Sequence, residues 1–99
     1  MFIRNPERTV TYEDEVKEDL IPYLDQYERL GELLLAIEYV LKRRPEDKET
    51  APIDVEGRNL RYITRYPAEE LDIPLPKIQL LYEYTEDEVI FWAVRVEEP

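Results

Sequence analysis

The chain contains no cysteine and no histidine among its 99 residues. Without cysteine it can form neither disulfides nor thiolate metal sites. Without histidine it lacks both the usual general base near neutral pH and the commonest metal ligand. Catalysis in this protein would have to use carboxylates, tyrosines, lysines or arginines, and we expect no metal and no cofactor.

Long hydrophobic runs are also missing. The run from Leu33 to Ile37 ends at Glu38, whereas a membrane span needs about 20 apolar residues. Residues 1–6 contain no apolar segment typical of a signal peptide. We therefore expect a cytoplasmic protein with no membrane partner.

Positive charge is scarce, because 24 acidic residues stand against 13 basic ones and give a net charge of −11. Such a charge repels nucleic acid at long range and favours a basic partner, so direct DNA binding is not expected. The balance reverses only locally, where Arg58, Arg61 and Arg65 lie near Asp54 and Glu56.

The hydrophobic pattern predicts one α+β domain over residues 1–99, a length that suffices for one core. The predicted elements are a strand at residues 8–12, helices at 13–27 and 30–44, and strands at 59–66, 77–84 and 89–96. Pro22 interrupts the first helical stripe, and we expect a kink there. Residues 45–57 are predicted to be a polar connector.

The three later strands have two unequal faces. Their even-numbered residues are almost all apolar, so we expect them, Tyr62, Tyr82 and Trp92 included, to pack beneath the helices. The odd-numbered face mixes apolar with charged side chains, which is typical of a binding surface. The partner-binding residues expected on this face are Ile63, Gln79, Leu81 and Phe91.

Several segments match a known family in their order and spacing. They are Glu15–Leu20, Leu33–Ile37 followed by Arg44-Pro45, Gly57–Ile63, Leu81–Tyr84 and Val89–Val96. In this order the chain resembles the RelE/ParE toxin superfamily of type II toxin–antitoxin systems. The resemblance implies a short N-terminal strand and a two-helix hairpin packed on one face of an antiparallel sheet.

The same resemblance implies a toxin that a partner antitoxin neutralises. Members of the RelE type cut mRNA on the ribosome, and members of the ParE type act on gyrase. RNA cleavage uses basic residues, because the transition state needs charge stabilisation and proton transfer. Carried over to this sequence, the resemblance makes Arg61 and Arg65 catalytic and makes Arg58, Lys77 and Arg95 the residues that bind RNA or another anionic ligand.

Two other interpretations stay open. The negative charge, together with an ending at residues 97–99 that carries no basic segment, favours a catalytically inactive relative that acts as a protein-interaction module. The absence of cysteine and histidine is also compatible with an engineered scaffold of this fold. In both, the arginines form ordinary surface ion pairs with Glu83 or Asp54.

Overall fold

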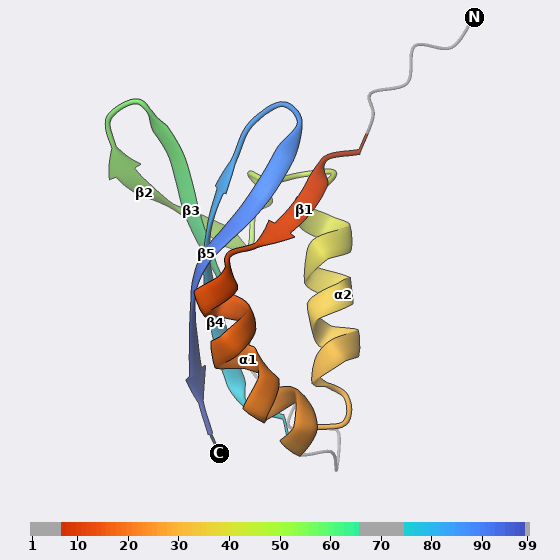
Figure 1. The fold of residues 1–99 in the computed structure, drawn as a ribbon. Coiled ribbons are helices and arrows are strands. Elements are labelled where there is room, and N and C mark those ends of the chain that lie inside the picture. Colours follow the sequence, from red (N-terminus) through yellow and green to blue (C-terminus); the bar gives the residue numbers. More distant parts are fainter. Residues whose placement is uncertain (1–6, 66–74, 99) are drawn as a thin grey trace, which may run out of the picture.

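Two helices cover one face of a five-stranded sheet in the computed structural model, which describes residues 7–65 and 75–98 (Figure 1). In chain order the elements are β1 (Thr9–Tyr12), α1 (Asp14–Gln26), α2 (Leu30–Leu41), β2 (Thr50–Val55), β3 (Arg58–Arg65), β4 (Lys77–Tyr84) and β5 (Glu88–Glu97). The strand order is β1-β5-β4-β3-β2. The α+β prediction is confirmed, but the sheet is mixed rather than antiparallel, because β1 runs parallel to β5.

The helices bury most of the apolar stripes that their sequences predict, but Leu24 of the predicted α1 stripe is 39% exposed. On α1, Val16 and Leu20 are buried, and the helix continues through Pro22. Proline removes the hydrogen bond to the carbonyl of Glu18, but both residues are exposed, so water can replace that bond. The buried face of α2 consists of Leu30, Leu34, Ile37 and Leu41. No helix in the described part of the chain is long and apolar enough to cross a membrane.

Residues 50–55 form β2, where we expected only a connector. The strand pairs antiparallel with β3, and the hairpin between them turns at Gly57. Gly57 has a φ of 77°, a left-handed conformation that glycine adopts without steric cost. Pro52 is tolerated because β2 is an edge strand, where a missing N–H breaks no ladder on the open side.

The face that β3 turns toward the helices differs from the expected one. Directly opposed residues of an antiparallel pair point to the same side of the sheet. Ile63 pairs with Leu80 and Arg61 pairs with Tyr82, and both β4 residues are buried beneath the helices. The odd-numbered residues of β3 therefore face the core. Ile63 is only 1% exposed, so its place on a partner-binding surface was wrong, whereas Tyr62, expected in the core, is exposed on the opposite side.

A β-bulge at Trp92 reverses the alternation of β5. Leu81 pairs with Ala93, but the next residue, Tyr82, pairs with Phe91, so Trp92 has no residue directly opposite. Phe91 consequently faces the helices and is fully buried, and Trp92 is 38% exposed on the other side. The expected placements of Phe91 on a binding surface and of Trp92 in the core were therefore both wrong.

Tyr82 links the middle of the sheet to the end of α2. Its side chain is fully buried, and its hydroxyl donates a hydrogen bond to the carbonyl of Pro45. Burial raises the pKa of Tyr82 above its ordinary value, so the hydroxyl remains a donor at physiological pH.

We expect Tyr82→Phe to lower the free energy of unfolding by about 1–3 kcal/mol, because the Pro45 carbonyl is then buried without a partner. Urea denaturation followed by circular dichroism measures the loss. Tyr84→Phe is the matched control, since the Tyr84 hydroxyl donates to Glu46 at an exposed position and should cost less. Equal losses in the two variants would contradict the structural role of Tyr82.

Candidate functional site

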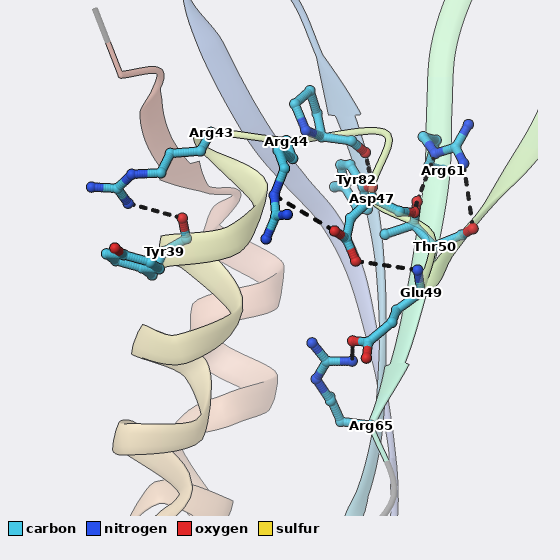
Figure 2. A network of polar contacts seen from close by, with 10 residues as sticks. Tyr39, Arg43, Arg44, Asp47, Glu49, Thr50, Arg61, Arg65 and Tyr82 are labelled. Carbon is cyan, nitrogen blue, oxygen red and sulfur yellow. Dashed lines mark hydrogen bonds and ion pairs between the residues drawn. The ribbon is translucent and has the colours of Figure 1, made fainter.

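Arg61, expected to be catalytic, is bound to the start of β2. Its guanidinium donates from Nε to Thr50 Oγ1 at 2.8 Å and from Nη2 to the Thr50 carbonyl at 3.3 Å (Figure 2). The Thr50 hydroxyl in turn donates to the carbonyl of Asp47 at 2.7 Å. Arg61 therefore fastens the segment between α2 and β2 to the sheet.

Arg65, the second expected catalytic residue, joins the same segment at another point. It forms an ion pair with Glu49, whose backbone N–H donates to Asp47 Oδ2 at 3.2 Å (Figure 2). Arg44 Nε lies 3.7 Å from Asp47 Oδ1 on the other side. The two arginines thus belong to a network that holds residues 47–50 against β3, and each is engaged by a group of its own chain.

Arg58 lies on the opposite side of the sheet and forms a bidentate pair with Glu83. The distances are 3.0 Å from Nε to Oε2 and 2.7 Å from Nη2 to Oε1. The Trp92 indole also donates to Glu83 Oε1, at 3.0 Å. The hydrogen bond from Arg58, and to a lesser extent the one from Trp92, holds the pKa of Glu83 below its ordinary value.

Lys77 and Arg95 share one acid at the other end of this side of the sheet. Lys77 Nζ lies 3.5 Å from Glu97 Oε2, and Arg95 Nε lies 3.7 Å from Glu97 Oε1. Beside them, Gln79 donates to Thr64 Oγ1 at 3.2 Å. The five cations expected to bind an anion are thus divided between the two sides of the sheet, and each has a partner within the chain.

One side of the sheet faces away from the helices, and we call it the open sheet face (Figure 1). Its apolar residues in the described strands are Ala51, Ile53, Val55, Leu60, Tyr62, Leu81, Ile90, Trp92 and Ala93. Gln79 and Leu81, two of the four predicted partner-binding residues, lie there. Tyr62 and Trp92 lie on this face in place of Ile63 and Phe91. Strand alternation alone could not predict this exchange.

A second apolar surface lies between α1 and α2, and we call it the inter-helix groove. It encloses about 540 Å³ and is lined by Tyr12, Lys17, Leu20, Ile21, Leu24, Gly31, Leu34, Leu35 and Glu38. Ile21 is 55% exposed and Leu35 is 65% exposed, although both are large and apolar. The sequence patterns predicted no groove here, because they show which helix face is apolar but not how far apart two helices lie.

The polar wall of the inter-helix groove is held in place by one hydrogen bond. The Tyr12 hydroxyl donates to Glu38 Oε2 at 2.8 Å, and the Tyr12 ring packs on Phe91 with ring centroids 4.8 Å apart. Burial and the adjacent carboxylate raise the pKa of Tyr12 far above its ordinary value. Glu38 therefore has a neutral hydrogen-bond donor beside it.

Comparisons with known proteins identified no relative of this chain. The chain matches no protein-family model, and no similar curated protein or solved structure was found. The RelE/ParE relationship therefore stays a prediction that rests on the order and spacing of the sequence segments.

Arg61→Ala should lower the free energy of unfolding by about 1–2 kcal/mol, because it removes two hydrogen bonds that hold Thr50. The matched control is Arg95→Ala, whose side chain is 75% exposed and should change stability by less than about 0.5 kcal/mol. Thermal unfolding measures both. An unchanged melting temperature for Arg61→Ala would show that this arginine has no structural task.

The lowered pKa of Glu83 predicts a pH-dependent contribution to stability. A carboxyl whose pKa is lower in the folded state stabilises the fold above its unfolded pKa of about 4.3, and the effect disappears as pH falls through the folded pKa. Glu83→Gln should therefore melt below the wild type at neutral pH, and the gap should narrow as pH falls from about 4.3 toward about 3.

Calorimetry across this pH range tests the expectation, with Glu86→Gln in the exposed β4–β5 turn as the control. A gap between wild type and Glu83→Gln that is the same at both pH values would rule out the ion pair as its origin.

Proposed function

We propose that this protein is a protein-interaction module that holds a cationic amphipathic helix of a partner in the inter-helix groove. The observation that carries the proposal is the apolar lining of the groove within a strongly acidic helical hairpin. Residues 13–41 contain nine acidic and two basic residues, a net charge of −7. A partner with one apolar and one basic face would satisfy both properties.

The dimensions of the groove suit a helix. α1 and α2 have 13 and 12 residues, so their shared length is about 18 Å, or a little over three helical turns. A helix that binds in a groove uses apolar residues at positions i, i+3 or i+4, and i+7, which span two turns. Ile21, Leu24 and Leu35 would contact these residues, and all three are exposed.

Two polar residues within the groove would orient the partner. Glu38, fixed by Tyr12, offers an acceptor for a lysine or arginine, and Lys17 lines the same groove with the opposite charge. Glu32 forms an ion pair with Arg29 at 2.8 Å, so the other acidic residues of the hairpin would provide most of the attraction for a basic partner. Electrostatic attraction of this kind raises the association rate and selects basic partners.

The expected toxin function agrees with this proposal in one respect only: an antitoxin with a basic amphipathic helix would be a suitable partner for the inter-helix groove. RNA cleavage is not part of the proposal, because phosphate would have to displace Thr50 from Arg61 and Glu49 from Arg65.

The direct probe is a labelled synthetic peptide that forms a helix of about three to five turns, with leucines on one face and lysines on the opposite face. We expect it to bind with a Kd in the micromolar range and to bind Leu35→Asp at least about tenfold more weakly. Gly31→Phe should have the same effect, because a Cβ at Gly31 meets no atom within 4 Å and a phenyl group attached there would occupy the groove. Fluorescence anisotropy measures the affinities.

The control probe has the same composition in scrambled order, so that its charge is equal but its apolar face is lost. Equal affinity for both probes would contradict groove binding and leave only nonspecific attraction. Cleavage of mRNA in the presence of ribosomes by the wild type, but not by a correctly folded Arg61→Ala variant, would instead support the toxin prediction.

A further inference from the structure

We infer that the open sheet face binds a second copy of the chain and forms a symmetric dimer. This inference does not depend on the inter-helix groove, which lies on the other side of the sheet among α1 and α2. It rests on three properties of the open sheet face: an apolar row that crosses four strands, its balanced charge and its area.

One row of apolar residues crosses four strands of this face. Ala51 pairs with Tyr62, Tyr62 with Leu81, and Leu81 with Ala93, so one row crosses β2, β3, β4 and β5. The bulge places Trp92 beside the end of this row. Tyr62 is 36% and Trp92 is 38% exposed. Tyrosine and tryptophan are enriched among the residues that contribute most to protein interfaces.

The charge on the open sheet face is balanced although the chain carries −11. Within the described strands its charged residues are three cations and three acids, namely Arg58, Lys77, Arg95, Glu83, Glu88 and Glu97. Most of them form ion pairs at the two ends of the face, with Glu83 at one end and Glu97 at the other. Two copies can therefore approach through this face without net repulsion.

The excess negative charge lies on the helical hairpin, on the side opposite the open sheet face. This distribution favours binding of a second copy through the open sheet face. Contact through the inter-helix grooves would bring two hairpins of net charge −7 together. Contact through the open sheet faces keeps the hairpins outside. Facing sheets lie about 10 Å apart and each hairpin adds about 10 Å, so the hairpins are about 30 Å apart, three Debye lengths at 0.1 M salt.

The area of the face sets the strength of the dimer. Four strands of about eight residues cover about 19 Å by 26 Å, on the order of 500 Å² for each copy. A stable interface of standard size buries about 800 Å² for each partner. We therefore expect a weak dimer that dissociates in the micromolar range.

Sedimentation equilibrium of the full chain between about 1 µM and 1 mM tests the inference. The wild type should change from 12.0 kDa at low concentration toward twice that mass. Tyr62→Asp and Ala93→Glu each place an unpaired charge in the apolar row, and both variants should stay monomeric at every concentration. Ala93 is small and exposed, so the second variant serves as the test if Tyr62→Asp fails to fold.

Leu35→Asp is the matched control, because it alters the inter-helix groove and should leave dimerisation unchanged. A wild type that stays at 12.0 kDa up to about 1 mM, or an association that Leu35→Asp abolishes and folded Tyr62→Asp does not, would overturn the inference. Peptide binding by the groove is measured separately, so the failure of one proposal leaves the other standing.

Discussion

The register of β3 on β4 is the constraint on which both surfaces of this protein depend. By pairing Ile63 with Leu80 it turns Arg61 and Arg65 toward the helical side and Tyr62 toward the open side. A slip of one residue would exchange every side chain of β3 between these two environments. The apolar contact of Ile63 and the bonds from Arg61 to Thr50 both stabilise the observed register.

The bulge at Trp92 has the same effect on β5. It lets Phe91 enter the core against Tyr12 and Tyr82 while Val94 still packs beside the core further along the strand. A regular strand would force either Phe91 or Val94 out of the core, because alternate residues face opposite sides. The extra residue is Trp92, which the bulge delivers to the open sheet face next to Glu83.

Charge is distributed in the same two-sided manner. The cations that the RelE/ParE resemblance suggested as ligands for RNA are used within the chain, where Arg61 and Arg65 hold the segment that leads from α2 to β2. The acids accumulate on the helical hairpin, while the open sheet face stays balanced. The described part of the molecule thus presents an apolar groove within an acidic helical hairpin and an apolar sheet face of balanced charge, which favour partners of different chemistry.

The sequence by itself determined the types of both helices and of four of the five strands, the bounds of β4 and the buried face of α2, because these follow from local periodicity. It did not reveal β2, whose proline and charged residues resemble a loop and whose strand conformation depends on pairing with β3. Only the tertiary structure decided which face of β3 is buried, where β5 bulges and how far α1 lies from α2. The alternation of a strand shows which residues share a face but not which face is buried, and pairing with a distant strand decides this. Ile63 is buried because it pairs with Leu80, and Phe91 is buried because it pairs with Tyr82. Arg61 lies on the same side and donates to Thr50.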